Sequence, residues 1–592
     1  MLISYSKTVA LASLCLSGVS SRFLGPMDPA PVDISDKDSI VRATWENITS
    51  IFDKHFSGKE RSPLLAGLNN HTFSLGLFSI HDPEAAGRLQ YHHTGPDVRN
   101  SSNGVRTVNG DSIYRVASLS KLFTVFAGLL ELKLQDWNLP LDEVFPEIAG
   151  LPNDDPIRHI EWHSVTPLNL ASQISGVPRD GLPFSPGDFW YTLMGLTGKP
   201  PVDPTTLGLP PISVEEANAA VPCKGYNCSV VDYIKGLQGP TFLPWQTPGY
   251  ADTGFILLGQ AISRLTNMTL EEYYRKAVLD PLGMAKTTAI APTEKGFPGY
   301  VVVAPLKDFA LDGGITRASG GVFSTTNDLA KLGIGILNST LLPADQTRKW
   351  MKPSAFTAHS EFAQGMGWEI YRYTHRDTGH ITDMYTKLGD AGSYSSYLVL
   401  IPDYDAGFSI IQASGIAGPA ARSAATQLLA DIVSEAILPA LQTQAAVEAK
   451  RNFAGTYTDG KNSSSLTLAY NETASNGAGL TLVSFTSEGH DVMAQLTAEL
   501  GSMSLVLQPA IAAPRPVSQL SFQATPVVDP ADEGAATGLF SKQFAVNSDW
   551  TSNNGAAYGG QGFGTFVFNV SSQGEATAVT AAFLRKTYRK QD

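Results

Sequence analysis

Ser118 and Lys121 stand three residues apart at the start of a long apolar segment that runs to Leu134. Residues at positions i and i+3 of a helix share a face, so the serine hydroxyl and the lysine amine would point into the same space. The free N–H groups at a helix N-terminus favour negative charge that develops nearby. The pair therefore suits acyl transfer by a serine whose proton is taken by a lysine.

The same spacing has a simpler interpretation, because a serine at a helix start is often a cap and a lysine is often a solvated charge. Ser-x-x-Lys also occurs at Ser4 and Lys7. The segment after Ser118 is apolar on all sides, however, which is typical of a helix buried inside a larger domain. An unpaired ammonium in such a helix is costly, and this favours a role for Lys121.

Composition indicates a folded protein of several domains. The chain has 592 residues, of which 43% are hydrophobic and 16% charged, and its net charge is -13. Binding to a phosphate backbone needs clustered Lys and Arg, so we expect no nucleic-acid partner. No phosphate-cradling glycine loop precedes a helix, and no cofactor is implied.

The N-terminal segment indicates secretion. Residues 1–21 combine a single Lys7 with a short apolar run that fits a signal peptide but is too short to cross a bilayer. We found no later segment that is long and apolar enough to span a membrane. Glycosylation sequons are dense, which favours a secretory route; they lie at Asn47, Asn70, Asn100, Asn227, Asn267, Asn338, Asn462, Asn471 and Asn569.

The cysteines agree with an oxidising compartment. Cys15 would leave with the signal peptide, so Cys223 and Cys228 remain as a pair in the segment CKGYNC. We expect them to form a small disulfide loop, the alternative being two unpaired thiols. A metal site would need more ligands, and none is predicted.

The order of elements indicates an α+β domain followed by an all-β domain. Helical patterns are expected at 38–57, from 118 onward and at 422–441, and strand patterns at 73–81, at 87–94 and between about 365 and 413. A Pro-rich insertion at about 181–244 has the character of a lid or binding loop. Short alternating strands fill 445–592 and predict a barrel or sandwich, so we assign 22–444 to the main domain.

Three motifs stand in a fixed order along the main domain: SLSK at 118–121, YAD at 250–252 and KLG at 387–389. Together they resemble those of the serine β-lactamase and penicillin-binding-protein superfamily. The resemblance is strongest to class C β-lactamases, their esterase relatives and the secreted fungal β-lactamase-related proteins that carry an added C-terminal β domain. It implies a three-layer domain with an antiparallel sheet flanked by helices.

The resemblance also implies roles for the motif residues. Ser118 would attack an acyl carbonyl, while Lys121 and Tyr250 would share the removal and return of its proton. Lys387 would stabilise a phenolate form of Tyr250 and lower its pKa. The backbone N–H groups of Ser118 and of Asp390, which follows Gly389, would hold the oxyanion.

Two positions depart from the family pattern. Asp252 replaces the usual Asn, and its carboxylate should favour protonated Lys121 and shift the work of the base to Tyr250. Leu388 replaces the Thr or Ser that often contacts a substrate carboxylate. Both changes predict weak turnover of acidic β-lactams without weakening the case for esters.

Three functions remain open on sequence alone. The first is a secreted serine hydrolase that acts on a small-molecule ester, amide or peptide through an acyl-enzyme. The second is an acyltransferase that uses the same site but passes the acyl group to an alcohol or amine. The third is a non-catalytic binding protein in which Asp252 has disabled the pair. No Gly-x-Ser-x-Gly elbow occurs in the chain, which disfavours an α/β-hydrolase.

Overall fold

The computed structural model describes residues 25–180, 204–211, 228–304, 306–461, 463–472, 478–500, 504–512, 517–526 and 555–591. The chain divides into two compact units. One comprises residues 33–373 and 383–440, and the other residues 1–32, 374–382 and 441–592. The predicted signal peptide and most of the predicted insertion lie outside the described residues.

An eight-stranded sheet organises the larger unit. Its strand order is β2-β1-β10-β9-β8-β7-β6-β5, with bounds β1 Thr72–Ser79, β2 Gln90–His93, β5 Pro353–Phe356, β6 Phe362–Gly365, β7 Glu369–Thr374, β8 Ile381–Ala391, β9 Tyr394–Ile401 and β10 Ala406–Ala413. The first and last parts of the domain meet at its centre, because β1 pairs with β10 in antiparallel register. All residues of β1, β9 and β10 are buried, so both faces of the sheet are covered.

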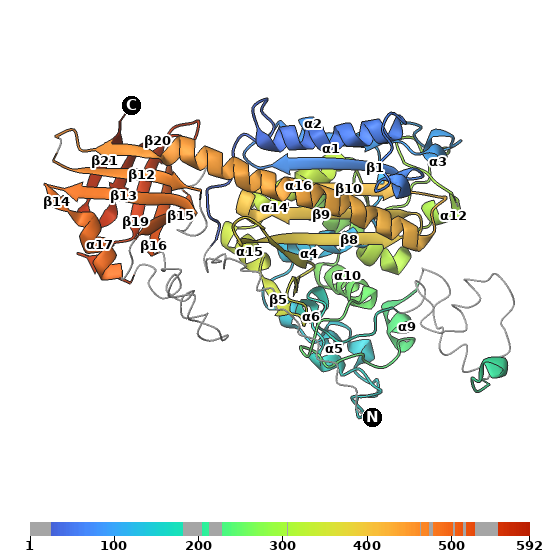
Figure 1. Cartoon of the computed structure of the whole chain (residues 1–592). Coiled ribbons are helices and arrows are strands. Elements are labelled where there is room, and N and C mark those ends of the chain that lie inside the picture. Colours follow the sequence, from blue (N-terminus) through green and yellow to red (C-terminus); the bar gives the residue numbers. More distant parts are fainter. Residues whose placement is uncertain are drawn as a thin grey trace, which may run out of the picture. The chain divides into compact units, whose positions relative to one another are not determined.

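The alternation of side chains along β1 shows which helices cover which face. Phe73 packs its ring against Phe52 of α1 (Ile40–Phe56). Phe78 has the opposite parity and lies against Gly333 of α14 (Thr326–Leu337). The two helices therefore cover opposite faces. In Figure 1, α16 (Pro419–Phe453) crosses in front of β8, β9 and β10.

A group of helices and short turns carries the candidate nucleophile. The short strand β3 (Tyr114–Arg115) pairs with the distant β4 (Phe323–Ser324) and leads into the 3-10 turn η2 (Ala117–Leu119) and then α4 (Ser120–Glu131). Around α4 pack α10 (Asp252–Thr266) and α13 (Arg317–Gly320). The other α-helices in the described part of this unit are α2 Ala85–Arg88, α3 Pro96–Arg99, α5 Leu141–Val144, α6 Pro167–Ala171, α9 Val230–Lys235, α11 Leu270–Tyr274, α12 Leu306–Phe309 and α15 Ala344–Trp350.

The smaller unit is a β-barrel with its own core. The strand order is β12-β11-β21-β20-β19-β16-β15-β13-β14, and an additional β12–β13 pairing closes the sheet on itself. The bounds are β11 Gly455–Thr458, β12 Ser465–Asn471, β13 Gly479–Ser487, β14 His490–Asp491, β15 Leu505–Ala512, β16 Gln519–Pro526, β19 Thr565–Val570, β20 Ala576–Ala581 and β21 Lys586–Lys590. The helix α17 (Val492–Leu500) and the two-residue strands β17 (Ala557–Tyr558) and β18 (Gln561–Gly562) complete the described part. The sequence predicted a barrel or a sandwich, and the closed sheet shows that the domain is a barrel.

The predicted fold class is confirmed, but the predicted end of the last helix is wrong. The pattern predicted a helix at 422–441, whereas α16 runs from Pro419 to Phe453. Residues beyond Leu441 are rich in Ala, Gln, Glu and Lys, which are strong helix formers. Pro439 lies inside the helix without ending it.

One helix conflicts with the expectation that no segment could span a membrane. Within the described residues, the segment 420–453 of α16 is long and apolar enough to span a membrane, by length and composition alone. The same test is passed by core helices of soluble proteins, and 44% of the apolar window is buried inside the protein.

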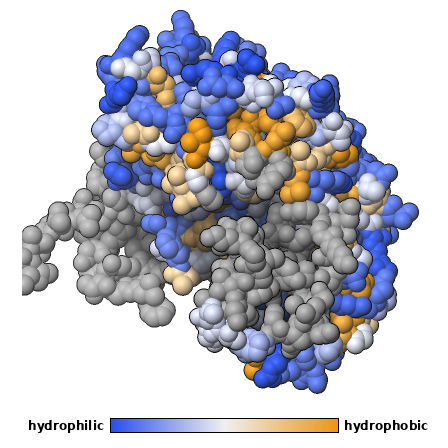
Figure 2. Space-filling view, turned by 90° about the vertical axis from the view of Figure 1, so that its right-hand side faces the viewer, coloured by the Kyte–Doolittle hydropathy of each residue, from blue (hydrophilic) through white to orange (hydrophobic). Residues whose placement is uncertain are grey.

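Figure 2 shows apolar patches set among hydrophilic side chains on the face at the right of Figure 1.

Close packing of α14 on the sheet generates a stability prediction. A Cβ atom at Gly333 would lie 2.3 Å from the Phe78 ring and 3.1 Å from Leu400. We expect Gly333→Ala to lower the free energy of unfolding by about 1–2 kcal/mol, because overpacking outweighs the gain in helix propensity. Gly335→Ala in the same helix meets only the tip of Leu282 and should be neutral or stabilising. Denaturant unfolding of both variants measures the difference, and equal stabilities would contradict the packing argument.

Candidate active site

The turn η2 holds Ser118 in place ahead of α4. The preceding Ala117 has φ 47°, a left-handed conformation that is unusual for a residue with a Cβ atom. Ser120 fixes this turn, because its hydroxyl donates to the Ala117 carbonyl and accepts the N–H of Val322. The helix therefore begins at Ser120, two residues later than predicted, and the second serine of the motif is structural.

Two side chains reach the Ser118 hydroxyl from different elements. Lys121 Nζ lies 3.0 Å from Ser118 Oγ, and the Tyr250 hydroxyl lies 2.8 Å from the same oxygen. Lys121 projects from the first turn of α4, whereas Tyr250 immediately precedes α10. A serine with an amine and a phenol at hydrogen-bond distance has the geometry of an activated nucleophile.

Lys121 is fully buried, with 0% of its surface exposed, and its nitrogen is surrounded by polar atoms. Nζ lies 2.5 Å from Asp252 Oδ1, 2.9 Å from Ser319 Oγ and 3.0 Å from the Ser319 carbonyl. The Ser319 hydroxyl also donates to Asp252. The Lys121 nitrogen can exchange a proton with the Ser118 hydroxyl, because the two atoms lie at hydrogen-bond distance.

Burial also corrects the predicted protonation of Lys121. Loss of hydration lowers the pKa of Lys121 below that of a free lysine, and the Asp252 carboxylate opposes this shift without cancelling it. Asp252 thus acts on Lys121 in the predicted direction, but burial, which the sequence did not reveal, outweighs it. Burial alone would raise the pKa of Asp252, but Lys121 and the Ser319 hydroxyl hold it below its usual value.

Tyr250 is positioned by the chain that precedes it. The N–H of Gly249 donates to the Gln173 carbonyl, and the Gln173 side chain accepts the N–H of Ala251. Although 38% of Tyr250 remains exposed, burial around its hydroxyl raises its pKa, and Lys387 opposes this shift only in part. The predicted phenolate is therefore wrong, and Tyr250 stays protonated and donates to Ser118.

Lys387 lies beside Tyr250 but is held by a residue that the sequence did not reveal. Its Nζ lies 5.3 Å from the centre of the Tyr250 ring. Glu369 of β7 accepts from Lys387 Nζ at 2.6 Å through one oxygen and from the Leu388 N–H at 2.9 Å through the other. Glu369 ends the segment GMGWE at 365–369, which lies outside the three motifs.

The KLG motif brings β8 against the nucleophile turn. A Cβ atom at Gly389 would lie 2.1 Å from the Val116 carbonyl and 2.9 Å from the Leu119 nitrogen, so only glycine allows this approach. The next residue, Asp390, has its carboxylate 2.8 Å from Nε of buried Arg422. This ion pair fixes the side chain of the residue whose N–H is predicted to hold the oxyanion.

Each cation of the site has its own carboxylate. The distances are 2.5 Å for Lys121 and Asp252, 2.6 Å for Lys387 and Glu369, 2.8 Å for Arg422 and Asp390, and 2.8 Å for Arg179 and Asp180. Asp180, like Glu369, is a residue that sequence reasoning missed. Because the cations are already paired, the site offers little attraction to an acidic substrate.

The remaining predicted residues lie elsewhere or outside the described part. Cys228 is disulfide-bonded, and its predicted partner Cys223 lies outside the described residues. The sequon residues Asn227 and Asn462 also lie outside them. Of the others, Asn471 and Asn569 are half-buried, and five are exposed: Asn47, Asn70, Asn100, Asn267 and Asn338. Among the described residues, no group of three or more His, Cys, Asp or Glu could hold a metal ion.

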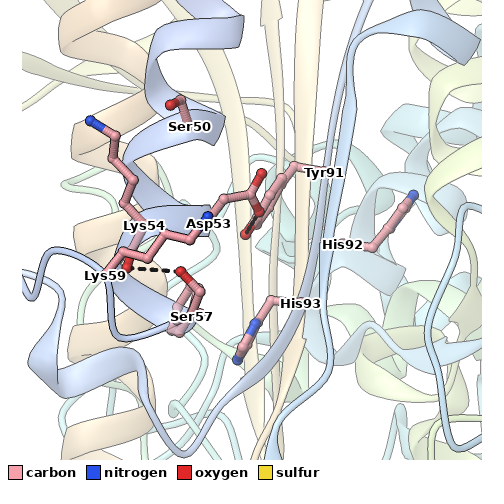
Figure 3. A pocket seen from close by; sticks show the side chains of 9 residues that line it. Ser50, Asp53, Lys54, Ser57, Lys59, Tyr91, His92 and His93 are labelled. Carbon is pink, nitrogen blue, oxygen red and sulfur yellow. Dashed lines mark hydrogen bonds between the residues drawn. The ribbon is translucent and has the colours of Figure 1, made fainter.

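A hollow of about 590 Å³ lies between α1 and the edge strand β2, away from the Ser118 elements (Figure 3). Tyr91 donates to Asp53 across it, and His93 stacks on Phe56 with ring centres 3.6 Å apart. Burial lowers the pKa of His93 to about 4, which suits a neutral packing residue. Lys54 and His92, which also line the hollow, contact Glu60 and Ser74.

Comparison with known families identifies the larger unit. The family model described as "Beta-lactamase" matches residues 85–433. The chain belongs to the β-lactamase family. A second model, "Beta-lactamase-like-like, C-terminal domain", matches residues 445–592.

This β-lactamase-family protein is similar to proteins of several organisms. A β-lactamase-like protein of Arthroderma benhamiae is 27% identical over 83% of this chain and 79% of its own. A probable hydrolase of Cochliobolus lunatus is 24% identical over 83% of this chain and 78% of its own. Among solved structures, a D-amino acid amidase from Ochrobactrum anthropi is 19% identical, with a TM-score of 0.46 over 68% of this chain and 99% of its own.

The contact at Gly389 generates a prediction about catalysis. Gly389→Ala would push β8 away from the nucleophile turn and displace the predicted oxyanion donors. We expect kcat/KM for an activated ester to fall about 100-fold. Gly150→Ala, where an added Cβ meets nothing within 4 Å, should have no effect. A Gly389→Ala enzyme with full activity would show that β8 does not position the reacting group.

The Glu369 contact generates a prediction about pH dependence. The Glu369 carboxylate adds to the high pKa of Tyr250, so Glu369→Gln should lower that pKa. If Tyr250 acts as a proton donor, the alkaline limb of kcat/KM should move to lower pH by up to about one unit.

Glu147→Gln is the matched control, because it breaks an exposed pair with Arg264. An alkaline limb that stays in place in Glu369→Gln would show that Glu369 does not govern the ionisation of Tyr250.

Proposed function

We propose that this protein is a secreted serine hydrolase that cleaves neutral esters or amides through an acyl-enzyme on Ser118. The observation that carries the proposal is the Ser118 hydroxyl at hydrogen-bond distance from both a buried amine and a protonated phenol. The β-lactamase-family membership and the probable hydrolases among the relatives support it.

The two groups divide the proton transfers of acylation. Ser118 Oγ attacks the substrate carbonyl as its proton passes to neutral Lys121, and the oxyanion rests on the N–H groups of Ser118 and Asp390. When the bond to the leaving group breaks, the Tyr250 hydroxyl gives its proton to the departing oxygen or nitrogen. The tyrosinate then recovers a proton from the Lys121 ammonium, whose Nζ lies 4.9 Å from the Tyr250 ring centre.

Deacylation uses the same groups. Water attacks the acyl carbonyl, and its proton passes to the same base. The Ser118 oxygen leaves and takes a proton, which restores the resting hydroxyl. An alcohol or amine in place of water would complete an acyl transfer with the same proton balance, so the acyltransferase alternative stays open and depends on what enters the site.

Charge and exposed apolar surface favour neutral substrates. The four cations near the site are each paired with a carboxylate, and Leu388 offers no hydroxyl to a substrate carboxylate. Phe242, Leu243 and Trp245 are partly exposed in the segment that leads to Tyr250. The backbone N–H of Trp245 donates to the Ile174 carbonyl, and this bond holds the segment next to the chain around Gln173. These side chains suit an apolar acyl or leaving group.

Secretion is part of the proposal and rests on sequence. The predicted signal peptide and the density of sequons support it. The exposure of five of the seven described sequon asparagines is compatible with glycosylation, which needs an accessible side chain.

A covalent probe tests the nucleophile. A fluorophosphonate should label the tryptic peptide 116–121, and Ser118→Ala should lose the adduct completely. Ser57→Ala, which removes an exposed serine of another element, should keep it. Folded wild-type protein that remains unlabelled would favour the non-catalytic alternative.

A substrate panel tests the charge argument. We expect kcat/KM for a neutral aryl ester to exceed that for an anionic cephalosporin by at least about 100-fold, because no unpaired cation among the described site residues meets the carboxylate. Comparable values for the two would contradict the proposed preference.

A further inference from the structure

A buried serine hydroxyl contacts the carbonyl of each peptide group that the proposed function assigns to the oxyanion. The first peptide joins Ala117 to Ser118, and its N–H is one of the two oxyanion donors. Its carbonyl accepts the Ser120 hydroxyl at 2.6 Å. Ser120 has 0% of its surface exposed, and its oxygen also accepts the Val322 N–H at 2.9 Å. Two backbone groups therefore hold this hydroxyl in place on the Ala117 carbonyl.

The second peptide joins Gly389 to Asp390 and has the same arrangement on other elements. Ser395 of β9 lies opposite Asp390 of β8 in the antiparallel register. The Ser395 hydroxyl donates to the Gly389 carbonyl at 3.0 Å, and Ser395 also has 0% of its surface exposed. Both donor peptides thus carry a serine hydroxyl on the carbonyl, although the two serines come from distant parts of the chain.

A hydroxyl bound to the carbonyl of a peptide strengthens the N–H of that peptide as a donor. The C=O and the N–H of a trans peptide point in opposite directions, so the hydroxyl on one side directs the N–H to the other. Hydrogen bonds in a chain polarise one another, and the low dielectric of a buried site increases this effect. A peptide held in advance also needs no reorientation when negative charge develops beside its N–H.

A third serine holds the two peptides next to each other. Ser396 of β9 lies opposite Gly389, and its hydroxyl donates at 2.8 Å to the carbonyl of Val116, which immediately precedes η2. A Cβ atom at Gly389 would lie 2.6 Å from Ser396 Oγ, so the glycine also leaves room for this hydrogen bond. The contact joins the sheet to the nucleophile turn and fixes the spacing between the two donor N–H groups.

We propose that Ser120 and Ser395 are positioning residues that orient and polarise the two oxyanion peptides from their carbonyl ends. The inference rests on the proposed function, because that function assigns the N–H groups of Ser118 and Asp390 to the oxyanion. Each serine acts only through the peptide that it holds. The second serine of the SLSK motif thereby gains a part in catalysis beyond fixing the turn.

Removal of the Ser395 hydroxyl should weaken catalysis without weakening substrate binding. For a neutral aryl ester we expect Ser395→Ala to lower kcat about fivefold to tenfold and to leave KM within about twofold, because the negative charge develops only in the transition state. Ser409→Ala on β10 is the matched control and should change neither value. Ser409 is also buried, and its hydroxyl has no hydrogen-bond partner among the described residues. Equal kcat values for wild type and Ser395→Ala would overturn the inference.

The infrared carbonyl stretch of the acyl-enzyme reports the strength of the oxyanion donors directly. An ester with a carbon-13 carbonyl that is slowly hydrolysed would label Ser118, so that only folded, acylated protein contributes to the band. We expect Ser395→Ala to move the stretch to higher frequency, because a weaker donor polarises the acyl carbonyl less. An unshifted band would contradict the inference. The same measurement on Ser120→Ala tests the first peptide independently if Ser395→Ala does not fold.

The two measurements separate this inference from the proposed function. Folded wild-type protein that is acylated neither by the neutral ester nor by the fluorophosphonate would refute the hydrolase and, with it, the role of the two serines. Acylated wild-type protein whose kcat and carbonyl stretch match those of Ser395→Ala would refute the role of Ser395 and leave the hydrolase intact.

Discussion

Burial of the Lys121 nitrogen is the constraint on which the site depends. An amine removed from water must be either neutral or fully paired. The structure provides Asp252 from α10 and Ser319 from α13, while Ser118 stands one turn away on the same chain segment. The packing of α10 and α13 around α4 therefore also decides the protonation of Lys121. A shift of either helix would change the contacts of Lys121 and its protonation together.

The site also requires that the backbones of neighbouring elements approach each other closely. Gly389 brings β8 against the nucleophile turn, and Gly259 of α10 lies where a Cβ atom would be 2.3 Å from Ala318 of α13. Both positions join a catalytic element to its neighbour without an intervening side chain. Small residues at these contacts keep the distances short enough for hydrogen bonds between elements that are far apart in sequence.

Apolar periodicity, a local signal, was sufficient for the fold class, and the resemblance carried by the three motifs was sufficient for the family and for the meeting of Ser118, Lys121 and Tyr250. They were insufficient for Glu369 and Asp180, whose roles arise only when distant segments pack together. For the same reason the predicted phenolate of Tyr250 was wrong, and the predicted effect of Asp252 on Lys121 is outweighed by burial. A charge partner can be guessed from spacing, whereas loss of hydration depends on everything that surrounds the group.

The two sheets differ in how they end, and this bears on association between chains. The β12–β13 pairing closes the barrel, so its long described strands present no open row of hydrogen-bonding groups. The larger sheet keeps edges at β2 and β5. Both edge strands have only four residues, and β5 begins with Pro353 and carries a register irregularity against β6. Short, interrupted edges resist pairing with a second chain, which protects a protein at high local concentration from strand-mediated aggregation.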